Sequence, residues 1–187
     1  CLATVLLLFA AAPFVQAQEN NSQATEVYLS FQYRGVVGVY VTTYYKDNQF
    51  YLPVSELFNT LQINHQIDQG TLTISGNYLG EKEYTIKLGS ENPVARAGDT
   101  EIQLSADDFL IKEIDYFIKP YIFEELFGLT FSTNFNNLTL DLETTDKMPV
   151  VAQYEREQER QSLNQQQPLY DRSYYPLRYD RDYGTID

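Results

Sequence analysis

Residues 50–63 read Phe50-Tyr51-Leu52-Pro53-Val54-Ser55-Glu56-Leu57-Phe58-Asn59-Thr60-Leu61-Gln62-Ile63, and this stretch decides the fold. It begins with aromatic residues, which favour extended backbone. After Pro53 the apolar residues recur at helical spacing, which predicts a short helix. Ser55 is a candidate N-cap, because a Ser hydroxyl can accept a hydrogen bond from a free N–H group of the first turn. The helical apolar positions are Val54, Leu57, Phe58 and Leu61.

The same pattern returns later in the chain when the sequence is shifted by 66 positions (117 − 51). Each copy reads strand, short helix, turn, strand. We therefore predict two tandem β-β-α-β repeats over residues 26–144, divided into about 26–78 and 79–144. The alternative is chance similarity between hydrophobic patterns, but polar residues coincide as well, at Thr73 and Thr139. The shift lays Tyr51-Leu52 on Phe117-Ile118, Leu57 on Phe123, Leu61-Gln62-Ile63 on Phe127-Gly128-Leu129, and Leu72-Thr73-Ile74 on Leu138-Thr139-Leu140.

The repeat predicts two matching sets of core residues. An apolar side chain that recurs at the same place in both copies is expected to face the same interior. The first copy contributes Tyr51, Leu52, Pro53, Leu57, Leu61 and Ile63. The second copy contributes Phe117, Ile118, Phe123, Phe127, Gly128 and Leu129.

Strand character surrounds both copies. Residues 26–35 alternate between apolar and polar, and residues 36–41 continue with β-branched residues, so two strands are expected there. Residues 46–49 have turn chemistry. Alternation at 84–88 and 101–104 predicts two more strands. The fold class is therefore α+β, rich in strands and with one short helix in each repeat.

Composition excludes two broad classes of protein. The 187 residues carry a formal net charge of −13, with 26 Asp and Glu against 13 Lys and Arg, so a basic surface for nucleic acid is missing. The 43% hydrophobic and 14% aromatic content is too high for a wholly disordered acidic chain. The length suits one domain, or two very small ones with flanking segments.

The first residues are typical of an export signal. Residues 1–17 contain an uncharged apolar run, and Val15-Gln16-Ala17 places small residues before a cleavage point, so the mature chain is expected to begin at Gln18. A retained anchor is the alternative. The basic region that precedes such a run is missing, which indicates a fragment. Residues 18–25 are expected to be a flexible N-terminus. Cleavage would remove Cys1, the only cysteine, so the exported domain needs no disulfide.

The character of the chain changes after Glu143. Residues 145–169 are charged and polar, and within them 154–161 have no apolar face, which indicates a solvated helix or a linker. The core is expected to end near Thr144. Residues 170–187 repeat Tyr-Asp-Arg, a composition that suits a membrane interface. The alternative is a disordered tail.

Two short motifs carry a family resemblance. The first is residues 50–57, and the second is Phe117-Ile118-Lys119-Pro120 together with Leu126-Phe127-Gly128-Leu129. In this arrangement they resemble the tandem unit of the copper amine oxidase N-terminal-like domain, a secreted bacterial stalk-type module. There a strand passes through a Tyr-Val-Pro-like motif into a helix that ends in Leu-Gly. Gln62 stands where the family usually has Gly, and the second proline is displaced by one position to Pro120. The resemblance covers residues 26–143 and implies no copper.

The residues that follow resemble a second arrangement. The closing strand at 138–142, the exit Met148-Pro149-Val150 and the charged residues 154–160 are similar to the periplasmic front end of outer-membrane usher-like proteins. In those proteins a charged segment precedes the barrel, and by this resemblance residues 170–187 would lead toward the first barrel strand. The resemblance implies a location in the bacterial envelope, as the periplasmic domain of a protein held in the outer membrane.

Catalytic chemistry is difficult to build from this sequence. His65 is the only histidine, and its alternation with Ile63 and Ile67 marks it as a strand residue. With no cysteine after processing, neither a nucleophilic pair nor a first-row metal site of the usual kind is expected. We therefore predict no catalytic residues, no metal and no cofactor. The carboxylates are those that an acidic composition supplies, at Asp68, Asp107-Asp108 and Glu124-Glu125.

Two functional classes remain. In the first, the chain is a non-enzymatic periplasmic binding and assembly module of an outer-membrane usher-like or secretion-type barrel protein, and its partner is a client polypeptide chain. In this reading strand edges such as 36–41 add a client strand by main-chain hydrogen bonding. In the second, the chain is a free-standing cell-envelope module that binds glycan or another envelope component. Nucleic acid is not an expected partner in either class.

Overall fold

The computed structural model describes residues 24–112 and 115–166, so the expected signal peptide, most of the flexible N-terminus and the Tyr-Asp-Arg segment lie outside the described residues. The described part is rich in strands and has three helices, which confirms the α+β class. The strands are β1 (Thr25–Tyr33), β2 (Val37–Lys46), β3 (Gln49–Pro53), β4 (Asn64–Asp68), β5 (Thr73–Tyr78), β6 (Lys82–Lys87), β7 (Val94–Ala97), β8 (Thr100–Gln103), β9 (Phe109–Ile111), β10 (Tyr116–Ile118), β11 (Thr130–Asn134) and β12 (Thr139–Glu143). The helices are α1 (Val54–Leu61), α2 (Pro120–Phe127) and α3 (Pro149–Gln166).

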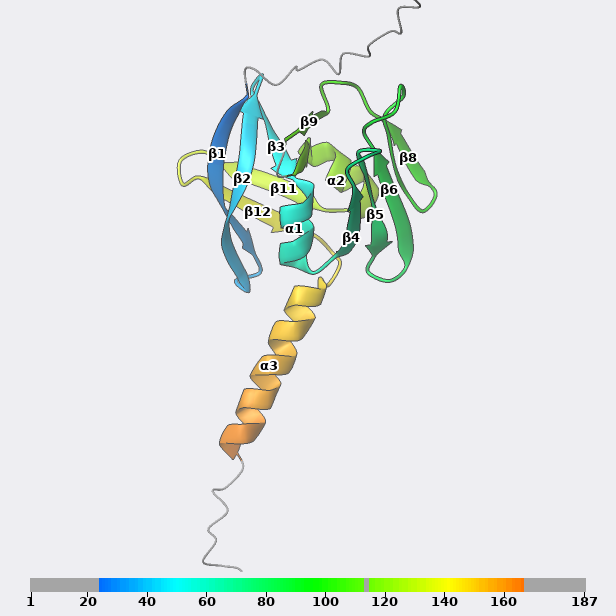
Figure 1. The fold of residues 1–187 in the computed structure, drawn as a ribbon. Coiled ribbons are helices and arrows are strands. Elements are labelled where there is room, and N and C mark those ends of the chain that lie inside the picture. Colours follow the sequence, from blue (N-terminus) through cyan, green and yellow to red (C-terminus); the bar gives the residue numbers. More distant parts are fainter. Residues whose placement is uncertain (1–23, 113–114, 167–187) are drawn as a thin grey trace, which may run out of the picture.

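These strands form two sheets that enclose the short helices α1 and α2 (Figure 1). The first sheet has the order β11-β12-β1-β2-β3-β10-β9, and the second has the order β4-β5-β6-β7-β8. Among the described strands only β1 and β12 pair in parallel. Residues from both sheets and both helices belong to one buried cluster, for example Phe31, Phe58, Ile86 and Phe123. The two sheets therefore share one core.

Both short helices end in the same way. The residue after each helix adopts the left-handed conformation, with φ 61° at Gln62 and φ 66° at Gly128. In this conformation its N–H group bonds back to carbonyl oxygens of the last turn, which satisfies groups that the helix leaves free. The helices begin at Val54 and Pro120, which are 66 positions apart (120 − 54).

The start of α1 corrects one prediction. Pro53 occupies the N-cap position, and no side chain of the flanking residue caps the helix. Ser55 is the second residue of the helix, too late to act as its N-cap. Its hydroxyl has no hydrogen-bond partner in the described structure. The cap is supplied from a distant part of the chain by Asp115. The prediction of Ser55 as N-cap is therefore wrong.

Burial follows the predicted core closely. Eleven of the twelve residues are buried, and Leu52, Leu57, Leu61, Ile118 and Phe123 have no exposed surface. The exception is Gly128, which is exposed and ends α2. The buried ones are Tyr51, Leu52, Pro53, Leu57, Leu61, Ile63, Phe117, Ile118, Phe123, Phe127 and Leu129.

Strand register also recurs along the chain. In the β2–β3 hairpin Tyr44 faces Tyr51, and in the β9–β10 hairpin Leu110 faces Phe117, each residue 66 positions (110 − 44 and 117 − 51) after its counterpart. These four side chains form a small buried cluster separate from the main core. Where β3 and β10 pair antiparallel, Leu52 faces Ile118, again 66 positions (118 − 52) further on.

The core continues beyond the expected boundary near Thr144. Met148 is fully buried and Val151 is 5% exposed in the same cluster as the sheets, so the expected end of the core is wrong. Asp146 connects this segment to both sheets. The Tyr33 hydroxyl donates to its backbone oxygen at 3.1 Å, and the Tyr78 hydroxyl donates to its Oδ2 at 3.0 Å.

After this junction α3 leaves the domain. It projects away from the two sheets as a single helix (Figure 1). Beyond Ala152 its described side chains are exposed. The charged segment at 154–161, for which the sequence allows a solvated helix or a linker, is a helix in the structure. Within residues 24–112 and 115–166, no helix is long and apolar enough to cross a membrane.

Candidate functional site

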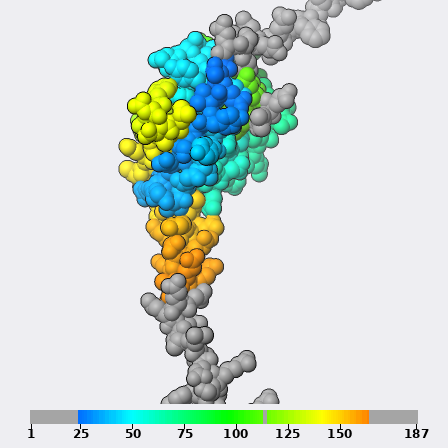
Figure 2. All heavy atoms as spheres, turned by 90° about the vertical axis from the view of Figure 1, so that its left-hand side faces the viewer, coloured from blue at the N-terminus to red at the C-terminus, as the bar shows by residue number. Residues whose placement is uncertain are grey.

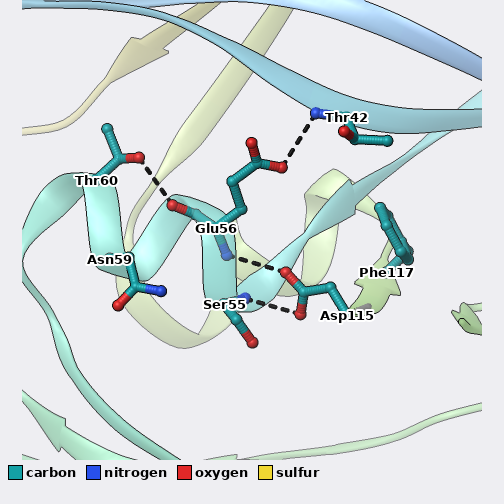
Figure 3. A pocket seen from close by; sticks show the side chains of 7 residues that line it. All are labelled: Thr42, Ser55, Glu56, Asn59, Thr60, Asp115 and Phe117. Carbon is teal, nitrogen blue, oxygen red and sulfur yellow. Dashed lines mark hydrogen bonds between the residues drawn. The ribbon is translucent and has the colours of Figure 1, made fainter. Parts of the chain in front are cut away.

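A pocket of about 410 Å³ lies where the first turns of α1 meet β2 and β10 (Figure 3). The helix contributes four polar side chains, the strand β2 contributes one, and the remaining wall comes from the start of β10 and the residue before it. Polar groups gathered around a concavity of this size are typical of a binding site. The lining residues are Thr42, Ser55, Glu56, Asn59, Thr60, Asp115 and Phe117.

Asp115 fixes the position of the pocket wall. Its carboxylate accepts hydrogen bonds from the backbone N–H groups of Ser55 at 3.0 Å and Glu56 at 2.9 Å (Figure 3). It also accepts one from the N–H group of Tyr116 at 2.7 Å. These contacts satisfy free donors at the start of α1 and place a negative charge at the positive end of the helix. The buried Asp115 thus has a sufficient structural role as a cap.

Glu56 reaches across the pocket to β2. Its Oε2 atom accepts a hydrogen bond from the backbone N–H group of Thr42 at 3.1 Å (Figure 3). Burial raises the pKa of the Glu56 carboxyl, and the Asp115 carboxylate also raises it, which together outweigh the lowering by the Thr42 N–H group. In the described residues neither Glu56 nor Asp115 forms an ion pair. The pocket therefore holds two carboxylates that lack a cationic partner.

The Ser55 side chain also lines this pocket. It is 9% exposed, and its hydroxyl oxygen finds no hydrogen-bond partner in the described structure. A buried polar atom without a partner is unfavourable by about 1–3 kcal/mol. A ligand in the pocket that offered a donor or an acceptor would remove this penalty.

Next to the pocket, one edge of β2 is open. β3 pairs with β2 only from Tyr44 to Lys46 and then turns into α1. The Ser30 N–H group donates to the carbonyl oxygen of Leu138, just before β12, so Ser30 and its partner Tyr40 turn their backbone groups away from each other. Backbone groups alternate in direction along a strand, so those of Gly38 and Tyr40 face the same open side as the Thr42 N–H group. No described strand occupies that side.

The hairpin that carries this edge exposes apolar side chains. Tyr28 is 59% exposed, Val39 41% and Tyr40 76%. The hairpin formed by β1 and β2 lies at the surface in the view that looks onto this side of the molecule (Figure 2). Exposed aromatic residues beside unpaired backbone groups are typical of a surface that contacts another chain.

His65 and its neighbours lie apart from this pocket. His65 is in β4, with Nδ1 3.2 Å from the carbonyl oxygen of Ile63 and its ring against Phe58. Its position agrees with the strand prediction. It is not among the residues that line the pocket.

The carboxylates singled out in the sequence serve local contacts instead. Asp108 accepts hydrogen bonds from Ser105 and pairs with Lys119 at 3.2 Å. Burial raises the pKa of Asp108, but the Ser105 and Lys119 contacts outweigh it and lower the pKa overall. Asp68 closes the turn to Gly70. Within the described ranges, no three His, Cys, Asp or Glu side chains gather as metal ligands would.

Sequence reasoning did not single out Glu56 or Asp115. Glu56 stands at a polar position of a helical pattern, and Asp115 is distant from it in the chain. The signal in the sequence that could have marked them is a mismatch between the two copies. The shift of 66 positions lays Glu56 on Ile122 and Asp115 on Gln49. Glu56 therefore stands in the first copy and Asp115 in the second, and neither has a charged counterpart in the other copy.

Comparisons of the chain with protein-family models, with curated proteins and with solved structures found no match. The chemistry of the pocket and of the adjoining edge is therefore the basis for a functional assignment. The edge offers both donors and acceptors in the spacing of a strand. While they are ionised, the two carboxylates of the pocket accept hydrogen bonds and donate none.

Proposed function

We propose that the protein is a non-enzymatic binding and assembly module that receives an extended segment of a client polypeptide on the open edge of β2. One observation carries the proposal: β3 leaves β2 at Tyr44, and the backbone groups of Gly38 and Tyr40 face no strand among the described residues. An unpaired edge binds a further strand through main-chain hydrogen bonds, while side-chain pockets provide selectivity.

We further propose that the domain consists of two related β-β-α-β copies, as in the copper amine oxidase N-terminal-like domain. Three features support this proposal: the helix bounds, the left-handed residues that end the helices, and the hairpin registers all recur at one offset. The β4–β5 and β11–β12 hairpins agree as well, with Asn64 facing Asn77 and Thr130 facing Glu143. Leu52 opposite Ile118 would lie at the two-fold axis between the copies.

The proposed setting is the periplasm, at the front of an outer-membrane usher-like protein. The polar helix α3 supports it, because its 18 residues would form a spacer of about 27 Å at 1.5 Å per residue. The test is to express the complete gene and fractionate the envelope. A heat-modifiable barrel in the outer membrane is expected. Full-length product in the soluble periplasm would instead favour the free-standing module that binds glycan or another envelope component.

Strand addition can be tested with the described domain. The probe is a capped peptide of alternating threonine and valine residues that ends in norleucine, titrated against ¹⁵N-labelled protein. We expect the amide signals of Gly38 and Tyr40 to shift and their hydrogen exchange to slow, because both N–H groups face the open edge. Signals of buried strands such as β6 should not move.

The matched variants are Tyr40→Pro and Tyr40→Thr. Proline removes the N–H group that faces the open edge but breaks no bond to β1, because Tyr40 and Ser30 form a non-hydrogen-bonded pair. Threonine keeps the N–H group and removes the ring. We expect Tyr40→Pro to abolish peptide binding and Tyr40→Thr to retain most of it, with urea midpoints as the control for folding. Equal binding by both folded variants would contradict strand addition at this edge.

A further inference from the structure

We infer that the client segment carries a lysine or arginine side chain, which the pocket beside Thr42 receives at the end of the docked strand. This inference rests on the proposed function, because it assigns the client's chemistry at the same edge. The pocket and the open edge share Thr42, so a chain that pairs with Gly38 and Tyr40 reaches the pocket with its next residue.

Glu56 sets the point at which pairing must stop. Its carboxylate already accepts the Thr42 N–H group, so a client strand cannot take that donor. Beyond Tyr40 the client therefore meets a carboxylate in place of a backbone edge. A group that donates hydrogen bonds and carries positive charge satisfies this carboxylate best.

The charges that line the pocket also favour a cationic client side chain. The described residues that line it include two carboxylates and no cationic side chain. Asp115 is 8% exposed and Glu56 is partly buried, so their charges are less screened than those of free surface groups. An ammonium or guanidinium group would compensate them and could also reach the unpartnered hydroxyl of Ser55. An acidic client side chain would be repelled.

Capping of the helix explains Asp115 but not Glu56. Asp115 already caps α1, so the helix does not need a second acidic group for that purpose. The corresponding position of α2, 66 positions later (122 − 56), is Ile122, which is fully buried. A helix of this kind therefore forms without a carboxylate at that position. Glu56 therefore adds to the pocket a carboxylate that the helix itself does not require.

The experiment compares three capped peptides of alternating threonine and valine that end in lysine, norleucine or glutamate. We expect the lysine peptide to bind about tenfold more tightly than the norleucine peptide, the size of one good charge-assisted contact, and the glutamate peptide to bind more weakly than both. The preference should shrink as salt concentration rises. The amide signals of Thr42 and Glu56 should move with lysine only.

The variant Glu56→Gln tests the residue. An amide oxygen can still accept the Thr42 N–H group, so β2 and α1 should stay connected while the charge is lost. We expect the lysine preference to fall to about twofold, since Asp115 remains. The matched control is Glu125→Gln, the same change at an exposed position of α2, which should leave the preference unchanged.

The outcomes separate the two proposals. If lysine and norleucine peptides shift Gly38 and Tyr40 alike and bind equally, the inference is wrong and strand addition stands. If no peptide affects these two amides, strand addition itself is wrong. A full lysine preference in Glu56→Gln would also overturn the inference, because another site would then be responsible.

Discussion

At the scale of single residues, the carboxylate of Asp115 caps α1, which no residue at the start of the helix does. Asp115 caps a helix that begins 61 positions earlier (115 − 54), and the nearby Ser55 hydroxyl caps nothing. The helix is therefore stabilised by tertiary structure at its first turn.

We predict that Asp115→Ala lowers the free energy of unfolding by about 1–2 kcal/mol, because two N–H groups of α1 lose their acceptor. The matched change Ser55→Ala should not lower the free energy of unfolding, since it removes only a buried hydroxyl that has no partner in the described structure. Urea denaturation followed by circular dichroism measures both. A larger loss for Ser55→Ala than for Asp115→Ala would contradict this account of the cap.

The raised pKa of Glu56 leads to a prediction about how stability depends on pH. Because the pKa is raised above its ordinary 4.5, the folded chain holds this proton more tightly than the unfolded chain. Its contribution to stability is therefore greatest at low pH and is lost as pH rises above 4.5 through the folded-state pKa. Glu56→Gln should remove this slope from the stability profile.

Asp108 is a control for this prediction, because its pKa is lowered where that of Glu56 is raised. Its pKa lies below the ordinary 3.8, so its contribution is present above that pH and is lost as pH falls further. Asp108→Asn should therefore change the profile at the acid end, and Glu56→Gln should change it above pH 4.5. Urea midpoints between pH 3 and 7 measure both profiles. A Glu56→Gln profile parallel to that of the wild type would contradict the raised pKa.

At the scale of elements, the two short helices hold the core together. Phe58 of α1 contacts Phe123 and Phe127 of α2, with ring centroids 6.0 Å and 5.5 Å apart. The same ring contacts Tyr84 of β6 at 5.5 Å, so the helices also connect to the second sheet. A change in either helix should therefore affect the whole domain.

We predict that Leu61→Asp and Phe127→Asp each unfold the domain. Leu61 has no exposed surface and Phe127 is 3% exposed, and burying an unpaired carboxylate opposes folding by several kcal/mol, comparable to the stability of a small domain. Loss of the cooperative urea transition is the expected result. Glu124→Asp is the control, because Glu124 is exposed on α2. If one of the two core variants kept its urea midpoint, the two positions would not be equivalent.

At the scale of the whole molecule, the domain includes the root of α3. Met148 and Val151 are buried against the core, and Asp146 accepts hydrogen bonds from tyrosines of both sheets. Burial raises the pKa of the Tyr78 hydroxyl, as does its bond to Asp146. The helix is thus attached to the domain at its start, where the Gln62 side chain also donates a hydrogen bond to Gln153.

We predict that a chain ending at Thr144 is less stable than one ending at Gln166 by about 3 kcal/mol. The shorter chain loses the burial of Met148 and Val151 and the contacts of Asp146. A chain ending at Gln158 should be as stable as the longer one, because it keeps every one of these residues. Equal urea midpoints for the chains ending at Thr144 and Gln166 would place the end of the domain where the sequence predicted it.

The amino-acid sequence by itself determined the class of fold, the two helices and their buried positions. These depend on periodicity and turn chemistry within about ten residues, and such short-range patterns survive whatever the rest of the chain does. The apolar spacing around Leu57 and the glycine at position 128 are examples. The start of α1 was misplaced, because the cap comes from Asp115 and not from Ser55.

Only the tertiary structure decided how these pieces meet. After α1 the β4–β5 hairpin joins the second sheet, whereas after α2 the β11–β12 hairpin joins the first and pairs in parallel with β1. Two hairpins of like pattern thus reach different partners, because docking depends on the surfaces that distant segments present. The same reason brings Asp115 to α1 and leaves the Tyr40 edge of β2 open, since both follow from where β3 and β10 lie in space.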